Sequence, residues 1–204
     1  MTAPAHSAAE RIIGRYDRHA LAFDAQRSRD RMERRWLDRF MAAMPRAATV
    51  LDIGCGMAEP IAAELIARDH PVTGIDSSAT MIGLCRRRFP GATWHQADMR
   101  TLALGQRFGG LIAWDSFVHL TARDQRAMFD IFKARADSRT PLMFTSGPAA
   151  GEAIGNWQGE PLYHASLDPA EYRHLLDGAG FDVVDFVSED PLCGGHTIWL
   201  AQAR

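Results

Sequence analysis

The sequence has few cysteines, little net charge and no long hydrophobic run, and each of these absences argues against a class of protein. Its three cysteines are odd in number and lie far apart, so neither a disulfide framework nor a CxxC metal site is expected. The net charge of −2 gives no support for a nucleic-acid or anionic-membrane partner. No apolar run approaches the roughly 18 residues of a membrane span, and no secretory signal is recognisable. A reducing, cytoplasmic location is therefore expected.

The composition is that of an ordinary globular domain. With 204 residues, of which 47% are hydrophobic, the chain is long enough for one domain with a full core. We expect residues 1–44 to form an N-terminal helical cap, disordered over 1–9, and residues 45–204 to form the core. Trp36, Leu37, Phe40 and Met41 recur at helical spacing and predict one buried face. The arginines of 27–35 alternate with acids, which indicates a solvated, ion-paired surface.

Beyond residue 45, short apolar runs alternate with helical patterns. The expected strands are 49–53, 72–75, 92–96, 110–114, 140–145, 181–187 and 196–201, and the expected helices are 58–68, 78–88, 122–136 and 168–177. Such alternation with short connections is typical of an α/β, doubly wound, mostly parallel sheet with helices on both faces. Residues 147–166 interrupt the rhythm with many glycines, and we expect them to form a lid-like insertion.

The stretch from Val50 to Pro60 reads strand, glycine turn and helix start. Gly54 and Gly56 permit a tight turn and a close approach of a ligand to the backbone. Such an arrangement is typical of nucleotide-type pockets. The NAD fingerprint G-x-G-x-x-G is incomplete here, because Glu59 stands at the third glycine and would repel a pyrophosphate.

Three further acids surround this turn. Asp52 precedes the glycines, Asp76 follows them by 22 residues at the end of the second strand, and Asp98 follows the third strand. In a doubly wound fold the acid after the second strand reaches ribose hydroxyls. Acids without a phosphate cradle suit a ligand that has a positive centre and no phosphate, such as S-adenosylmethionine. The alternative role of each acid is structural: bonding turn amides, capping a helix or lying on a surface loop.

Taken together, these segments resemble those of class I S-adenosylmethionine-dependent methyltransferases. The matching stretches are Val50-Leu51-Asp52-Ile53-Gly54-Cys55-Gly56, Val72-Thr73-Gly74-Ile75-Asp76, Asp98-Met99, and Phe108 to Asp115. Ala58 departs from the pattern, which often has glycine there. The resemblance implies a seven-stranded sheet with its last strand antiparallel and a cofactor across the carboxyl ends of strands one, two and four. The predicted cofactor-binding residues are Asp52, Gly54, Cys55, Gly56, Asp76, Ser77, Asp98, Met99, Trp114, Tyr16 and Arg27.

Residues 114–120 follow the fourth strand and are expected to face the transferred methyl group. His119 titrates near neutrality and is the candidate general base, while Asp115 is a candidate for orienting the acceptor. His164, in the insertion, is the third candidate catalytic residue. The alternatives are packing or helix capping for His119, a structural role for Asp115, and a place in an ordered surface loop for His164. Convergence of His119, His164 and His196 on a metal has no support from their spacing, and no metal is predicted.

The sequence therefore predicts methyl transfer from S-adenosylmethionine to a small organic acceptor by in-line displacement, with His119 needed only if the acceptor is protonated. The acceptor atom and the oligomeric state are not predicted. Two alternatives stay open: a protein that binds the cofactor without transferring its methyl group, and, less favoured, an NAD-dependent oxidoreductase. No nucleic-acid or membrane partner is expected.

Overall fold

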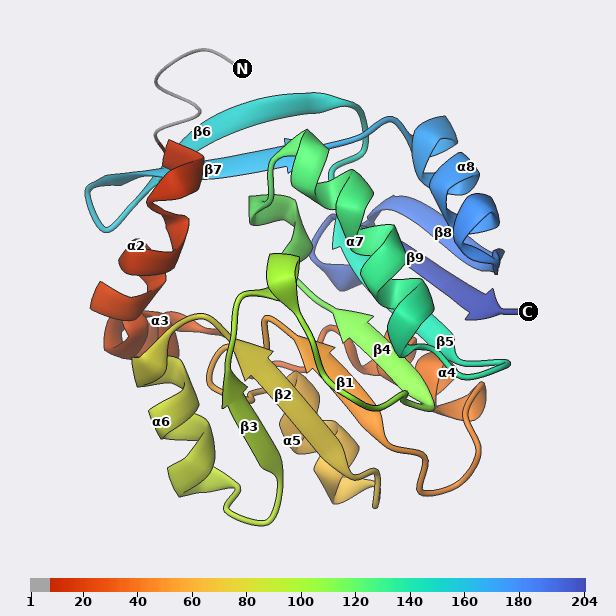
Figure 1. The fold of residues 1–204 in the computed structure, drawn as a ribbon. Helices are drawn as coiled ribbons and strands as arrows, with labels where there is room; N and C mark the ends of the chain where they lie inside the picture. Colours follow the sequence, from red (N-terminus) through yellow and green to blue (C-terminus); the bar gives the residue numbers. More distant parts are fainter. Residues whose placement is uncertain (1–7) are drawn as a thin grey trace.

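A computed structural model describes residues 8–204 and shows a central sheet between two layers of helices (Figure 1). The sheet has seven strands in the order β3-β2-β1-β4-β5-β9-β8, and β9 is antiparallel to both neighbours. The strands are β1 (Val50–Ile53), β2 (Val72–Asp76), β3 (Thr93–Gln96), β4 (Gly110–Ala113), β5 (Pro141–Ser146), β8 (Phe181–Asp190) and β9 (His196–Ala203). The predicted fold class, including the reversed last strand, is confirmed.

The helices flank this sheet and cap its ends. They are α2 (Ile12–Arg18), α3 (Ala20–Gln26), α4 (Arg34–Ala42), α5 (Ile61–Ala67), α6 (Ala79–Arg88), α7 (Ala122–Arg135) and α8 (Pro169–Ala179), with short 3-10 turns η1 (Met99–Thr101), η2 (Phe117–His119) and η3 (Pro191–Cys193). Ser78, Thr121 and Asp168 accept hydrogen bonds from the first turns of α6, α7 and α8. These N-caps supply acceptors for otherwise unpaired amides.

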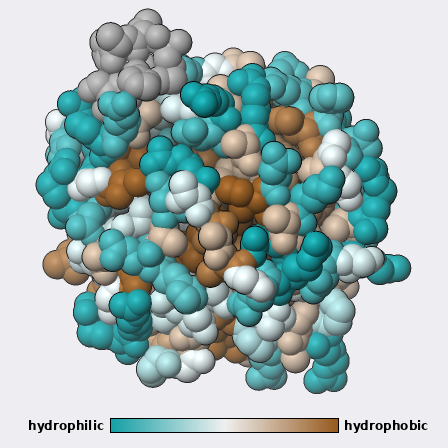
Figure 2. Space-filling model, viewed as in Figure 1, coloured by the Kyte–Doolittle hydropathy of each residue, from teal (hydrophilic) through white to brown (hydrophobic). Residues whose placement is uncertain are grey.

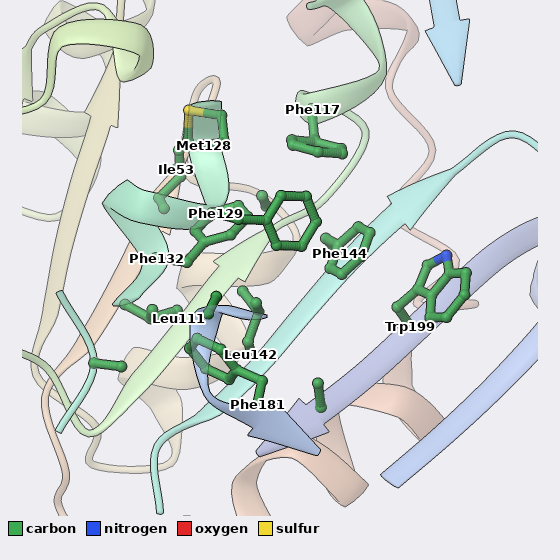
Figure 3. Close-up of a cluster of buried hydrophobic side chains, with 14 of the residues drawn as sticks. Ile53, Leu111, Phe117, Met128, Phe129, Phe132, Leu142, Phe144, Phe181 and Trp199 are labelled. Atoms are coloured by element: carbon green, nitrogen blue, oxygen red, sulfur yellow. The ribbon is translucent and has the colours of Figure 1, made fainter. Parts of the chain in front are cut away.

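Two hydrophobic clusters fill the two faces of the sheet. One packs α7 and α8 against the strands and is rich in aromatic rings, among them Phe117, Phe144 and Trp199 (Figure 3). The other packs α4, α5 and α6 against the opposite face and includes Trp36 and Phe40. Alternate residues of β1 and β4 enter opposite clusters, as expected for strands covered on both sides.

The N-terminal cap is not one continuous helix. Its helical pattern is divided at His19 and again between Gln26 and Arg34. As a result, α2 and α3 reach the carboxyl ends of the strands (Figure 1), while α4 packs against the same face of the sheet as α5 and α6. Residues 1–7, on which most of the expected disorder falls, lie outside the described residues. Ala8 and Ala9 are buried against Tyr163 and Ala165, so the expectation is wrong for these two positions.

Residues 147–166 contain a β-hairpin rather than an irregular insertion. Strand β6 (Gly151–Trp157) pairs with β7 (Glu160–Ser166), and Gln158 and Gly159 at the turn both have positive φ. A two-residue loop with this backbone follows the natural twist of a hairpin. The many glycines concealed the pattern, because a two-stranded ribbon with an exposed outer strand shows no clear alternation.

No helix among residues 8–204 is long and apolar enough to cross a membrane.

Among residues 8–204, eight non-glycine residues have a positive φ, and Ala58 is the one in the turn between β1 and α5. Ala58 has φ of +74° and is buried in the turn before α5. The left-handed region costs an L-residue roughly 1–2 kcal/mol. The methyltransferase pattern that the sequence resembles often has glycine at this position, and glycine adopts a positive φ without this cost.

We expect Ala58→Gly to leave the free energy of unfolding within about 0.5 kcal/mol, because relief of strain offsets the lost methyl burial and the added chain entropy. Ala62→Gly is the matched control: it removes an equally buried methyl from α5, where no strain is relieved, and is expected to cost about 1–2 kcal/mol. Urea denaturation measures both. Equal losses in the two variants would contradict the strain at Ala58.

Candidate functional site

The turn after β1 meets the turn after β4 at Gly54. Gly54 has φ of +75°, and a Cβ atom there would lie 2.3 Å from the Cβ of Ser116. The Ser116 hydroxyl donates a 2.6 Å hydrogen bond to the carbonyl of Ile53. Only glycine therefore allows these two strand ends to touch, which brings the segment after β4 beside the glycine turn.

Asp76, at the end of β2, ties the same turn to α6. Its Oδ2 accepts a 3.0 Å bond from the amide of Gly56, and its Oδ1 accepts a 2.8 Å bond from the amide of Ser78. Burial raises the pKa of Asp76, while these two hydrogen bonds work in the opposite direction. Asp76 thus has the structural role that the sequence left open, because it bonds the amides of the turn and of the start of α6. It also lines the cavity described below.

Asp52 is a carboxylic acid without a cation partner inside the strand. Its side chain is 2% exposed, and its Oδ2 has no hydrogen-bond partner among the described residues. Burial, with a further contribution from the negative charge of Asp76, raises the pKa of Asp52 to about 7. An acid of this kind is incomplete without a hydrogen-bonding or cationic ligand.

A cavity of about 530 Å³ runs across the carboxyl ends of β1, β2 and β4. This volume lies within the range of small-molecule sites. Figure 2 shows hydrophobic residues near the middle of this face, surrounded by hydrophilic ones. The predicted site residues in its wall are Tyr16, Arg27, Asp52, Gly54, Cys55, Gly56, Asp76, Ser77, Asp98, Met99, Trp114, Asp115 and His119.

Asp98 and Glu59 enter ion pairs at the rim. Asp98 pairs with Arg100 and caps the 3-10 turn η1. Glu59 pairs with Arg29 at 3.0 Å and with Arg88 at 3.4 Å. Part of the repulsion expected between Glu59 and a pyrophosphate is therefore neutralised, which weakens that one argument against NAD.

Asp115 marks the other end of the cavity. It has a positive φ of +51°, and its carboxylate lies 3.0 Å from His196 Nε2 and 3.6 Å from Arg27 Nη1. Burial acts to raise the pKa of Asp115, but the hydrogen bond from His196 and the charges of His196 and Arg27 lower it overall. Strained backbone conformations cluster at functional sites.

Both ring nitrogens of His119 are engaged in hydrogen bonds. Its Nδ1 lies 2.9 Å from the carbonyl of Tyr163, so it donates there, and its Nε2 accepts from the hydroxyl of Tyr16 at 2.8 Å. Burial lowers the pKa of His119 to about 4, so the ring is neutral at pH 7. Burial and the nearby charge of Asp115 raise the pKa of Tyr16, which keeps its proton. Tyr16 and His119 thus form a hydrogen-bonded pair in the cavity wall.

His164 lies outside the cavity wall. Its ring centroid is 4.7 Å from that of His119, and burial lowers its pKa. His196 is bonded to Asp115 instead of joining these two rings. Within residues 8–204, no group of three or more His, Cys, Asp or Glu side chains could hold a metal ion.

Several wall residues were not predicted as site residues. Ile12, Ile13 and Phe23 line the cavity beside Tyr16, and Glu152 enters it from β6. Ile12 and Tyr16 share a face of α2 at a spacing of four residues, a signal that could have been used. Glu152 had no such signal, because nothing local indicates which side of the exposed hairpin faces the cavity.

Residues 50–135 match a family model described as a methyltransferase domain. An N,N-dimethyltransferase of dTDP-3-amino-3,6-dideoxy-alpha-D-glucopyranose from Streptomyces fradiae is 36% identical over 80 residues, covering 39% of this chain and 31% of that protein. An O-methyltransferase from Pyrenophora dematioidea is 28% identical over 160 residues, covering 71% of this chain and 60% of that protein. The chain thus spans less than two thirds of the length of these curated relatives.

Solved structures share the fold over nearly the whole chain. An S-adenosylmethionine-bound amino pentose methyltransferase from Micromonospora echinaspora has a TM-score of 0.70 at 20% identity, covering 91% of this chain and 96% of that one. A 1,6-didemethyltoxoflavin-N1-methyltransferase from Burkholderia thailandensis has a TM-score of 0.74 at 19% identity, covering 99% and 90%.

The raised pKa of Asp52 leads to a pH-dependent stability. The unfolded state ionises near pH 4 and the folded state near pH 7, so ionisation weakens the ligand-free fold progressively between these values, by up to about 1.4 kcal/mol per pH unit. We expect Asp52→Asn to match the parent at pH 4 and to be increasingly more stable than the parent up to pH 7, with no further gain above. Urea denaturation at pH 4.5, 6 and 7.5 measures this. A stability difference independent of pH would contradict it.

Proposed function

We propose that this chain, whose residues 50–135 belong to the methyltransferase domain family and whose fold is that of class I methyltransferases, transfers the methyl group of S-adenosylmethionine to a small organic acceptor. The observation that carries the proposal is one continuous cavity from the glycine turn to Asp115 and His119. Cofactor and acceptor can therefore meet at the carboxyl ends of the central strands, where doubly wound folds bind their ligands.

The residues present fit the cofactor. The unpartnered oxygen of buried Asp52 lies in a wall that also carries Gly54 and Gly56, where no side chain blocks the backbone. We infer that these residues, with Cys55, Arg27 and Trp114, hold its methionine part. Asp76 and Ser77 would hold the ribose, and Asp98 and Met99 the adenine.

S-adenosylmethionine, when bound, supplies an electrophilic methyl group on a sulfonium centre that is already a good leaving group. Most of the catalysis by the protein is then positioning of the acceptor. Tyr16 and His119 add a proton path: Tyr16 Oη takes a proton from the acceptor as its own proton moves to His119 Nε2, 2.8 Å away. This path replaces direct contact of His119 with the acceptor.

The hairpin and the N-terminal helices close over the acceptor end. Trp157 stacks on Tyr16 with ring centroids 5.6 Å apart, and Glu160 forms ion pairs with Arg18 at 2.6 Å and His19 at 2.7 Å. We infer that this contact excludes water and that the hairpin acts as the lid expected for residues 147–166.

The acceptor is small in this proposal, because the cavity is enclosed by the chain's own cap and hairpin. The similar proteins include an amino pentose methyltransferase and an O-methyltransferase, so the relatives do not agree on the acceptor atom. We propose no nucleic-acid partner. A labelled-methyl screen over metabolite classes identifies the acceptor.

Calorimetry with S-adenosylhomocysteine and NAD tests the cofactor assignment. We expect the first to bind and NAD not to bind. Asp76→Ala is expected to weaken binding about tenfold or more, because each lost hydrogen bond to a buried hydroxyl costs roughly 1–3 kcal/mol. Asp130→Ala, on the exposed face of α7, is the control and should bind normally. Binding of NAD in place of S-adenosylhomocysteine would refute the proposed function.

Turnover of Tyr16→Phe and His119→Ala tests the proton path. With an acceptor that must lose a proton, each variant is expected to lower kcat by about 10²-fold or more while leaving the affinity for S-adenosylhomocysteine nearly intact. His164→Ala is the matched control, because this ring neighbours His119 but lies outside the cavity wall. If His164→Ala costs as much as His119→Ala, or if both path variants turn over normally at saturating acceptor, the path is wrong.

A further inference from the structure

The acceptor end of the cavity has an excess of negative charge. Eight carboxyl groups line the whole cavity, against three guanidinium groups. In the proposed function Asp52, Asp76 and Asp98 face the cofactor, whereas Asp115 and Glu152 face the opposite end. A cavity with low-dielectric walls concentrates ligands of the opposite charge.

The guanidinium at this end is already engaged. Arg27 lies 2.7 Å from buried Glu33 and 3.6 Å from Asp115. Its charge is already shared between these two carboxylates, and the proposed function gives its remaining N–H donors to the methionine part of the cofactor. Glu152 accepts a 2.8 Å hydrogen bond from the Tyr163 hydroxyl, and within residues 8–204 it has no ion-pair partner. Beside Asp115 and Glu152 an anionic acceptor would meet two carboxylates and a guanidinium that is already paired with Glu33 and Asp115.

Asp115 is held as an anion and remains open to the cavity. His196 on one side and Arg27 on the other fix its carboxylate, yet its side chain is 36% exposed and lines the cavity. Because its pKa is lowered, Asp115 does not take up a proton near neutral pH. It can attract a cation there without acting as a base.

The surrounding groups suit a cation with an organic body. Tyr16 and Phe23 present aromatic rings to the cavity, with centroids 5.6 Å apart, and aromatic faces attract cations. Trp114, next to Asp115, is 5% exposed, and its Nε1 has no hydrogen-bond partner among the described residues. An unpaired buried donor in the cavity wall suits a ligand oxygen, and the proposed function supplies one from the methionine part of the cofactor beside this end.

We infer that the acceptor is an organic amine, bound as its ammonium form between Asp115 and Glu152 against the rings of Tyr16 and Phe23. This inference rests on the proposed function and narrows it from any small acceptor to an amine. Asp115 is then a recognition group, and the ammonium gives its proton to bulk water before the neutral amine attacks the methyl group.

Matched probes test the inference by binding rather than by turnover. The full chain is saturated with S-adenosylhomocysteine and titrated by calorimetry at pH 7 with two sets of probes. The first set is 2-phenylethylamine, 2-phenylethanol and 3-phenylpropanoate. The second is cyclohexylamine, cyclohexanol and cyclohexanecarboxylate. We expect each amine to bind at least about tenfold more tightly than the alcohol and the carboxylate of its set.

Variants assign this preference to the named residues. Asp115→Asn should remove most of the preference for the amine while leaving the alcohol unchanged, and asparagine tolerates the positive φ at this position. Glu152→Gln should remove part of the preference for the amine. Asp130→Asn makes the same charge change on the exposed face of α7 and should have no effect.

Two results would overturn the inference: an alcohol or carboxylate that binds as tightly as its matched amine, or an equal loss in Asp130→Asn and Asp115→Asn. These results leave the proposed function intact, because the titration begins from a chain that already binds S-adenosylhomocysteine. Failure at that earlier step would instead refute the proposed function itself.

Discussion

The close contact between Gly54 and Ser116 is the constraint on which the site depends. A Cβ atom at Gly54 would lie 2.3 Å from Ser116, so a side chain at this position would push apart the strand ends of β1 and β4. Asp76, the last residue of β2, connects that strand to the same turn by accepting a hydrogen bond from the Gly56 amide. Three strand ends are thus joined by one glycine turn, and a single cavity extends from the turn to Asp115 and His119.

The same turn accumulates acids that weaken the ligand-free fold. Asp52 is buried and Asp76 is half-buried in this region, and burial raises the pKa of each. A buried carboxyl without a cation is costly to keep ionised, and hydrophobic side chains of similar size would be more stable. Such a cost is typical of functional sites, where a ligand supplies the missing partner.

The proposed acceptor end is assembled from segments far apart in the sequence. The N-terminal helices bring Tyr16 and Arg27, the segment after β4 brings Asp115, the hairpin brings Glu152, and the last strand brings His196. Trp157 and Glu160 hold the hairpin against α2 and α3. One half of the cavity is therefore built on the ends of the central strands. The other half is formed by the N-terminal helices and the β6–β7 hairpin, which cover those strand ends.

The sequence by itself determined the alternating strands and helices, the glycine turn, and the acids near the ends of β1, β2 and β3, because these are local patterns of hydrophobicity and backbone freedom. The tertiary structure alone decided that His119 is occupied by Tyr16 and Tyr163, that Arg27 is neutralised by Glu33 and Asp115, and that Glu152 faces the cavity. Hydrogen bonds and ion pairs between distant segments depend on how those segments pack, and no local pattern encodes that packing. The character of the glycine turn was therefore predictable, whereas the charge at the acceptor end was not.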